Sequence, residues 1–370
     1  MKNKIIKSLL LLPLLAFLAL GCKKTVEPQN VVYIANAGDG NSSERVTVAE
    51  AGASLDITAR AATEVNNNVS ISFAVAPDAL EKYNSAWGTN YKLLPEKYYN
   101  FSSTSAQINA GSAFAAPVKL NIQALESDLS DAERYAIPVS INNSGNSMPV
   151  LQSAQTLIVL IDRVVFTTVP YLQNTFIKVD LKTPYSGLKA WTFEWRCNMA
   201  GMSSNNRALM MAYGDNTEFY TRFGDVIIKP SQLQVKFGAY GQFSPEQEFQ
   251  ANKWYHFAMV YDGSSAKWYA DGKLILNVPL NASFNFNMVQ FGNSNTTGMV
   301  NEMRFWSVAR TPAQITNDMY AVSPNAPGLE GYWKCNEGSG TTFKDATGKG
   351  NDMTGTGNIT WRTGIRMPAE

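Results

Sequence analysis

The sequence predicts an all-β protein made of two β-sandwich domains. Short segments rich in valine, isoleucine and aromatic residues alternate apolar and polar side chains along most of the chain, which is typical of half-buried strands. Turn dipeptides such as Asp262-Gly263 and Asp271-Gly272 separate several of these segments and favour hairpins. At 370 residues the chain also exceeds the length at which one hydrophobic core normally keeps growing. We therefore expect two domains, each with its own core.

The N-terminus has the pattern of a signal peptide. Several lysines precede an apolar run from Ser8 to Leu20. The run is too short to span a membrane as a helix, and Pro13 interrupts it. We predict that residues 1–21 direct export.

The predicted signal peptide is followed directly by a cysteine, in the sequence Leu-Ala-Leu-Gly-Cys. This ending resembles the lipobox of bacterial lipoproteins, in which the cysteine is acylated and becomes the new N-terminus. The resemblance implies that Cys22 is lipidated and that residues 22–30 form a tether, since several acyl chains suffice for stable anchoring. The alternative is an ordinary secretion signal followed by a cysteine that carries no lipid.

The first predicted domain covers residues 31–163 and consists mainly of strands. One helix interrupts it, with Asp78 as the expected N-cap and Gly88 placed to end it. The strand-like segments are residues 31–37, 54–62, 68–76, 117–125, 135–143 and 155–165.

A signature within this domain connects it to a known family. Residues 79–112 contain the pattern Y-N…G-T-N-Y-K-L-L-P…Y-Y followed by I-N-A-G. The pattern resembles the N-terminal domain, of unassigned function, of Bacteroidetes outer-membrane lipoproteins. The resemblance implies an immunoglobulin-like β-sandwich that precedes laminin-G-like modules or glycoside hydrolases. It also implies an outer-membrane lipoprotein that faces either the cell surface or the periplasm.

The second predicted domain covers residues 167–370, with a boundary near residues 166–170 where aromatic residues and glycine become more frequent. One short helix is expected, with Thr311 as N-cap, Pro312 at the first helical position and Gln314 completing a capping box. The strand-like segments, which should fold as two stacked sheets, are residues 190–198, 207–213, 218–223, 232–240, 254–261, 266–272, 288–292, 299–308 and 331–337.

Three motifs of this second domain occur in the order known from one family. Residues 252–275 contain W-Y-H-F-A-M-V-Y-D-G…W-Y-A-D-G, residues 298–315 contain G-M-V-N-E-M-R-F-W, and residues 329–352 contain Y-W-K-C-N-E-G-S-G. These resemble laminin-G-like, concanavalin A-type lectin domains, which implies a jelly-roll sandwich. The resemblance also implies a structural calcium ion with Asp345 as a ligand, although a plain glycine-rich turn explains that segment equally well. Asn301 replaces an aspartate of the family pattern.

Several residues that could do chemistry have a simpler structural interpretation. His256 is the only histidine and alternates in register along a predicted strand, so we expect a structural role. Cys197 and Cys335 share strand faces with tryptophans and should be buried, either as free thiols or as a disulfide. Glu194 and Glu302 are each isolated and are interpreted as solvated strand residues.

Charge and motif content argue against nucleic-acid binding and catalysis. The chain contains 31 Lys and Arg residues against 30 Asp and Glu residues, so it lacks the basic surplus that binding to phosphate backbones requires. It contains no E-x-D-x-(x)-E array of the kind that supplies paired carboxylates to glycosidases, and no G-x-S-x-G motif. We therefore predict a protein that is not an enzyme.

A glycan site is predicted on the second domain. Sugar rings stack their C–H faces on aromatic side chains, and their hydroxyl groups need polar partners. Alternation over residues 218–223 directs Tyr220 and Arg222 away from the core, and nearby turns and loops supply further candidates. The complete set of predicted glycan-binding residues is Tyr213, Asp215, Asn216, Tyr220, Arg222, Tyr240 and Phe243.

Together these inferences predict a non-catalytic, glycan-binding outer-membrane lipoprotein of a polysaccharide-utilisation system. Its expected partners are a polysaccharide or oligosaccharide, the outer membrane, a transporter and other capture lipoproteins, and the role follows from the family resemblances. Laminin-G-like domains also bind proteins, so an adhesion or scaffold lipoprotein is the second hypothesis. A glycoside hydrolase of concanavalin A-like fold is the third.

Overall fold

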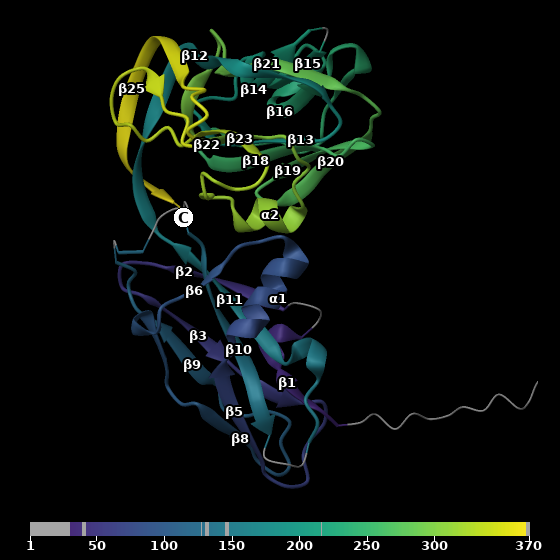
Figure 1. Ribbon diagram of the computed structural model, residues 1–370, viewed down its shortest axis with the longest axis vertical. Helices are drawn as coiled ribbons and strands as arrows, with labels where there is room; N and C mark the ends of the chain where they lie inside the picture. The colour runs from purple at the N-terminus through teal and green to yellow at the C-terminus, as the bar shows by residue number, and fades with distance from the viewer. Residues whose placement is uncertain are drawn as a thin grey trace, which may run out of the picture.

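In the computed structural model, strands dominate both halves of the chain, and the two halves form separate sandwiches stacked end to end (Figure 1). Within the described ranges, neither helix has the length and apolar character needed to cross a membrane. The structure describes residues 30–38, 42–126, 128–129, 133–144, 148–215 and 217–367.

The N-terminal sandwich packs a six-stranded sheet, with the order β2-β11-β10-β5-β8 and β6 beside β10, against a three-stranded sheet of order β3-β9-β7. Alternate residues of both sheets, such as Leu120 and Ile137, point inward and are fully buried in one core. A separate pair, β1-β4, lies beside them. The strands are β1 (Val32–Ile34), β2 (Ser43–Val48), β3 (Ala53–Ile57), β4 (Ala59–Ala61), β5 (Val69–Val75), β6 (Lys92–Leu93), β7 (Tyr99–Phe101), β8 (Ser105–Ile108), β9 (Val118–Ile122), β10 (Tyr135–Ser144) and β11 (Thr156–Arg163).

Helix α1 (Pro77–Trp87) lies on the outer face of the six-stranded sheet. Its buried residues Leu80 and Tyr83 pack on Ile158 and Leu160 of β11. The predicted N-cap is wrong by two residues, because Ala76 is the N-cap and Pro77 opens the helix with its fixed φ angle. Gly88 ends the helix as expected, with a φ of +63°.

The C-terminal sandwich consists of two stacked layers (Figure 1). Strand β12 pairs with β21 along one part and with β22 along another, so it joins the layers into one continuous sheet of order β17-β16-β15-β14-β21-β12-β22-β13-β18-β19-β20. The strands are β12 (Val165–Leu188), β13 (Trp191–Met199), β14 (Arg207–Gly214), β15 (Thr217–Asp225), β16 (Ile228–Lys236), β17 (Gln242–Phe243), β18 (Trp254–Tyr261), β19 (Ser265–Ala270), β20 (Lys273–Pro279), β21 (Phe284–Gly292), β22 (Thr297–Trp306), β23 (Leu329–Trp333), β24 (Thr342–Phe343) and β25 (Met353–Met367).

Aromatic side chains fill the space between the two layers. Trp191, for example, is fully buried and has six aromatic rings within 6.4 Å of its own ring, centroid to centroid. Aromatic side chains bury a large apolar area each, so this core accounts for much of the stability of the domain. The all-β class and the two β-sandwiches predicted from the sequence are confirmed.

Helix α2 (Pro312–Asn317) begins as the sequence predicts. Thr311 accepts a hydrogen bond from the backbone of Gln314, and the Gln314 side chain accepts one from the backbone of Thr311. Ile315 of α2 packs on Ala258 and Tyr269, so the helix covers the outer face of the layer that contains β13 and β18. Figure 1 shows α2 between this layer and the N-terminal sandwich.

The two sandwiches are joined strand to strand, not by a loop. Only Val164 separates β11 from β12, and the first residue of β12 pairs with Met367 of β25. Side chains also connect the halves: Arg45 Nη2 donates to Asn317 Oδ1 at 2.8 Å, and Arg134 Nη2 donates to the Ala321 carbonyl at 2.6 Å. Independent folding of residues 31–163 and 167–370 stays a prediction.

Candidate functional site

The outward face of β15 carries the central residues of the predicted glycan site. Phe219, Thr221 and Phe223 are fully buried, whereas Tyr220 and Arg222 are half-buried on the opposite face. This is the layer farther from the N-terminal sandwich in Figure 1. The alternation inferred from the sequence is therefore confirmed, although the alternation alone does not show that the face binds a ligand.

Tyr220 and Arg222 are held in place by a shared set of hydrogen bonds. The Tyr220 hydroxyl donates to Asn206 Oδ1 at 2.8 Å, and Arg222 Nη1 donates to the same oxygen at 3.2 Å. Arg222 also donates through Nε and Nη2 to Gln234 Oε1, at 2.9 and 2.6 Å, and pairs with Asp225 at 2.5 Å. Two side chains fixed this way lose little conformational entropy when a ligand binds.

The same contacts set the electrostatics of the face. Burial raises the pKa of Tyr220 although Arg222 opposes the shift, so the phenol stays protonated near neutral pH. A protonated phenol can both donate and accept hydrogen bonds. The Arg222 guanidinium also lies 5.6 Å from the centroid of the Tyr220 ring. An aromatic surface and a fixed donor group thus lie next to each other.

Tyr213 belongs to the same face. On β14, Met211 pairs with Tyr220 and Tyr213 pairs with Glu218, so all four side chains alternate to one side of the layer. The Tyr213 hydroxyl lies 3.4 Å from the sulfur of Met211, and burial raises the pKa of Tyr213. The structure therefore places Tyr213, Tyr220 and Arg222 on one surface.

The remaining predicted residues lie elsewhere or outside the described residues. Phe243 pairs with the fully buried Val235 and packs on the core, so it points away from the outward face. Tyr240 is 45% exposed in a short 3-10 helix, with its ring beside Phe284 at the edge of the core. Asp215 is exposed in the turn before β15, and Asn216 lies outside the described residues.

Two residues of this surface were not predicted from the sequence. Gln234 is almost fully buried on β16 opposite Arg222, and Asn206 holds both Tyr220 and Arg222 from the turn before β14. Alternation with Leu233 and Val235 could have placed Gln234 on the outward face. The contribution of Asn206 depends on a turn with a φ of +56°, for which the sequence gives no clear signal.

The interpretation of Glu194 and Glu302 as solvated residues is wrong. Glu194 is fully buried, with Oε2 lying 3.2 Å from His256 Nε2 and 3.3 Å from Arg304 Nη1, and Oε1 lying 3.5 Å from Arg310 Nη1. Glu302 is 5% exposed and lies 2.5 Å from Arg304. Both carboxylates are on the outer face of the nearer layer, where α2 and its flanking segments exclude water.

The charges of this buried cluster follow from its contacts. Burial alone would raise the pKa of Glu194, but Arg310, His256 and Arg304 outweigh burial and lower it to about 2. Burial lowers the pKa of His256 despite the contact with Glu194, so the imidazole is neutral near neutral pH. His256 thus has the structural environment expected from the sequence.

Cys197 and Cys335 are buried free thiols, and the disulfide alternative is wrong. Burial raises the pKa of both thiols, which makes them unreactive small apolar groups.

Asp345 closes a turn through hydrogen bonds to both of its carboxylate oxygens. One carboxylate oxygen accepts hydrogen bonds from the backbone N–H groups of Tyr332 and Thr347 and from the Thr347 hydroxyl, and the other accepts from the backbone of Asn351. These hydrogen bonds agree with the glycine-rich turn that the sequence left open as the alternative, and calcium binding stays a prediction. In the described part of the chain, no three His, Cys, Asp or Glu side chains gather into one cluster.

The fold and the outward face define a class: a two-domain β-sandwich protein whose second domain is of the concanavalin A-like type. Residues 174–316 match the family model of the concanavalin A-like lectin/glucanases superfamily, and residues 27–148 match a family model for an N-terminal domain. A comparison with curated protein sequences gives no match.

Several solved structures are similar to this chain. A "putative carbohydrate binding protein" from Bacteroides ovatus is 24% identical, with a TM-score of 0.54, over 90% of this chain and 97% of that one. EndoBT-3987 from Bacteroides thetaiotamicron, solved with a Man5GlcNAc product, is 23% identical over 36% of this chain and 30% of its own, with a TM-score of 0.30. A SAP-like pentraxin from Limulus polyphemus is 10% identical over 54% of this chain and 95% of its own, with a TM-score of 0.38. The match to the Bacteroides ovatus protein extends through both sandwiches, so the two-domain arrangement occurs in another protein.

Proposed function

We propose that this protein binds glycans, without cleaving them, on the outward face of β15. The observation that carries the proposal is the cluster of Tyr220, Arg222 and Tyr213, held by Asn206 and Gln234. The aromatic rings offer surfaces for the C–H faces of a sugar, and Arg222 keeps one Nη1 hydrogen that can be donated to a sugar hydroxyl. The likeness to a protein described as carbohydrate-binding supports this proposal.

The buried state of Glu194 and Glu302 supports a structural role for these two carboxylates. Glycosidases need two accessible carboxylates, about 5 to 10 Å apart depending on mechanism. Glu194 and Glu302 are neighbours on the sheet, but both are held by arginines and excluded from solvent. A substrate could reach them only if α2 and its flanking segments moved away.

We further propose that the chain is an outer-membrane lipoprotein anchored through Cys22, which lies outside the described residues. It would act within a polysaccharide-utilisation system, capture oligosaccharides or polysaccharides, and pass them to a transporter together with other capture lipoproteins. The lipobox-like sequence and the resemblance of residues 79–112 to Bacteroidetes lipoproteins support this placement. Either the cell surface or the periplasm would be compatible with it.

A second candidate function is protein binding, favoured by one observation. Val226 and Ile227, in the turn between β15 and β16, are 91% and 74% exposed. Two adjacent exposed apolar side chains at a hairpin tip are suited to contact with another protein. They follow Asp225, which pairs with Arg222, so such a partner would contact the edge of the proposed glycan face.

A glycan microarray with the purified full chain tests the proposal. We expect retention of a defined set of glycans, with loss of retention in Tyr220→Ala and no loss in Phe114→Ala, a matched control whose exposed ring lies in the N-terminal sandwich. Release of new reducing ends from a retained glycan would contradict the non-catalytic role. Retention of no glycan, combined with loss of a protein partner in Ile227→Ser, would favour the second candidate.

A further inference from the structure

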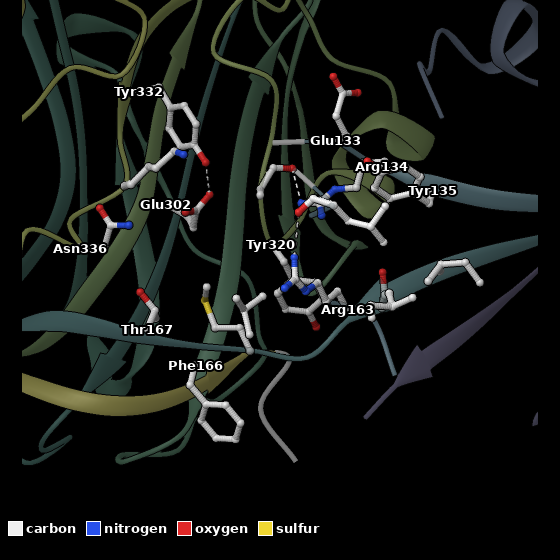
Figure 2. A pocket seen from close by; sticks show the side chains of 18 residues that line it. Glu133, Arg134, Tyr135, Arg163, Phe166, Thr167, Glu302, Tyr320, Tyr332 and Asn336 are labelled. Atoms are coloured by element: carbon white, nitrogen blue, oxygen red, sulfur yellow. Dashed lines mark hydrogen bonds between the residues drawn. The ribbon is translucent and has the colours of Figure 1, made fainter. Parts of the chain in front are cut away.

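A cavity of about 150 Å³ lies where the two sandwiches meet. The N-terminal sandwich contributes Arg134 and Arg163, the start of β12 contributes Phe166 and Thr167, and the C-terminal sandwich contributes Tyr320, Tyr332 and Met367 among others (Figure 2). The cavity lies at the junction with the N-terminal sandwich, whereas β15 belongs to the layer farther from that sandwich (Figure 1).

A buried arginine lies directly behind one wall of this cavity. Arg196 of β13 is only 2% exposed, and its Nη1 atom lies 2.5 Å from the sulfur of Met367, which lines the cavity. Its guanidinium also lies over the rings of Trp254 and Tyr320, 5.1 and 4.9 Å from their centroids. Tyr320 is a second lining residue, so Arg196 contacts the cavity wall through two side chains.

Arg196 lacks the partner that a buried guanidinium normally has. A buried cation usually pairs with a carboxylate, and a thioether sulfur is only a weak acceptor. In the part of the chain that the structure describes, no carboxylate forms an ion pair with Arg196, and Met367 is its one hydrogen-bond acceptor.

Three described carboxylates line the cavity, Glu133, Asp162 and Glu302, and each already pairs with another cation. Glu302 pairs with Arg304 and accepts a hydrogen bond from Tyr332 at 2.6 Å, and Asp162 pairs with Arg45 at 2.5 Å. If Glu302 turned toward Arg196, the fully buried Arg304 would lose one of its carboxylates, and if Asp162 did so, the half-buried Arg45 would lose its own. Among the described residues that line the cavity, no carboxylate is free to pair with Arg196, so an acceptor supplied by a ligand would fit there.

Met367 occupies the place where such an acceptor would fit. Its sulfur also accepts a hydrogen bond from Asn301 Nδ2 at 3.1 Å, while Asn301 Oδ1 has no hydrogen-bond partner although it is buried. Methionine is flexible and adapts to irregular space. Rotation of this one side chain would open Arg196 and Asn301 to the cavity.

We infer that this cavity is a second binding site, separate from the glycan face, which takes a small carboxylate ligand with the carboxylate on Arg196 in place of the Met367 sulfur. Guanidinium and carboxylate match in a planar, two-bond geometry. The Asn301 amide would donate a third hydrogen bond. Tyr320, Phe166 and Thr167 offer aromatic and hydroxyl groups to the rest of the ligand, which suits a uronic acid as well as a simpler organic acid.

Calorimetry with the full chain tests this inference and separates the two sources of carboxylate. Sodium glucuronate should bind at least about tenfold more tightly than glucose, its neutral counterpart. Acetate as the third probe distinguishes the sources: affinity equal to that of glucuronate indicates a simple organic acid, and weaker affinity indicates an acidic sugar. Binding of neither carboxylate at concentrations where the protein stays folded would overturn the inference.

Variants locate the site. Arg196→Met should abolish binding of glucuronate, whereas Tyr220→Ala should leave it unchanged, so failure here is distinct from failure of the glycan face. Met367→Ala should strengthen binding several-fold because it removes the competing sulfur. Met367→Glu should abolish binding and raise the melting temperature relative to Met367→Gln, because a carboxylate within the chain then pairs with Arg196. If Arg196→Met does not fold, the Met367 variants test whether the ligand binds at Arg196. Unchanged binding of glucuronate in Met367→Glu would overturn the inference.

Discussion

His256 Nε2 lies 3.2 Å from Glu194 Oε2, and both side chains are completely excluded from solvent. The pair lies at the centre of a charged cluster that also contains Arg304 and Arg310. Because β13, β18 and the segment around α2 each contribute to it, the cluster holds α2 on the sheet. Its contribution should therefore be visible in the stability of the C-terminal sandwich.

The pH dependence of unfolding should report this pair. The pKa of His256 is lowered from 6.5 in the folded chain, so the unfolded state binds the extra proton and stability falls as the pH drops below 6.5. The pKa of Glu194 is lowered from 4.5 to about 2 in the folded chain. Its contribution to stability is therefore complete above pH 4.5 and is lost as the pH falls from 4.5 to about 2. Melting temperatures measured from neutral to acidic pH should fall in both windows.

His256→Gln provides the control for the upper window. The variant cannot take up the proton, so the fall in melting temperature just below pH 6.5 should shrink, while the fall below 4.5 should persist. Identical pH profiles for the variant and the wild type would show that His256 does not change its protonation on unfolding.

Removal of the Glu194 carboxylate should be strongly destabilising. Glu194→Ala leaves Arg304 and Arg310 buried with fewer partners, and breaking a buried ion pair costs about 3 to 5 kcal/mol. Urea denaturation of Glu194→Ala and of Glu246→Ala, an exposed matched control, measures the difference. A loss as small as that of the control would mean that the cluster contributes little to stability.

The burial of Glu194 and Glu302 also shows where prediction from sequence ends. Local signals were sufficient for α2, where Thr311 and Gln314 form the expected capping box, and for β15, where alternation separates Tyr220 from Phe219. The burial of Glu194 depends instead on α2 covering the outer face of a distant strand. Periodicity assigns a residue to a face but does not say what covers that face.

The candidate site was predictable only in part for the same reason. Tyr213, Tyr220 and Arg222 lie on regular strands, so alternation brings them to one surface. Phe243 lies on the short strand β17, whose register with β16 turns it inward, and a loop-like sequence gave no indication of that register. The cavity behind Met367 requires both domains, and no local pattern predicts it.

Calcium removal should have no effect on stability. The Asp345 carboxylate is already saturated by backbone N–H groups and a hydroxyl, so EDTA should leave the melting temperature unchanged. Asp345→Ala should destabilise the chain by about 1 to 3 kcal/mol, because buried donors lose their acceptor. A melting temperature that falls with EDTA and recovers with added calcium would show that calcium binds.

Membrane association should depend on Cys22. In a bacterial host that lipidates exported proteins, the wild-type chain should sediment with membranes, and Cys22→Ala should appear in the soluble fraction because it lacks the acyl anchor. Ultracentrifugation followed by immunoblotting gives the distribution. An unchanged membrane fraction for the variant would contradict lipid anchoring.

The central claim is that a glycan binds on the outward face of β15, and titration calorimetry on Tyr220→Ala tests it most directly. With a glycan retained by the wild-type chain, the variant should lose about 1 to 2 kcal/mol of binding free energy, the scale of one aromatic contact. Its melting temperature should stay near that of Phe114→Ala, because Tyr220 is only half-buried. Wild-type affinity in a folded Tyr220→Ala variant would contradict the account and place the site elsewhere.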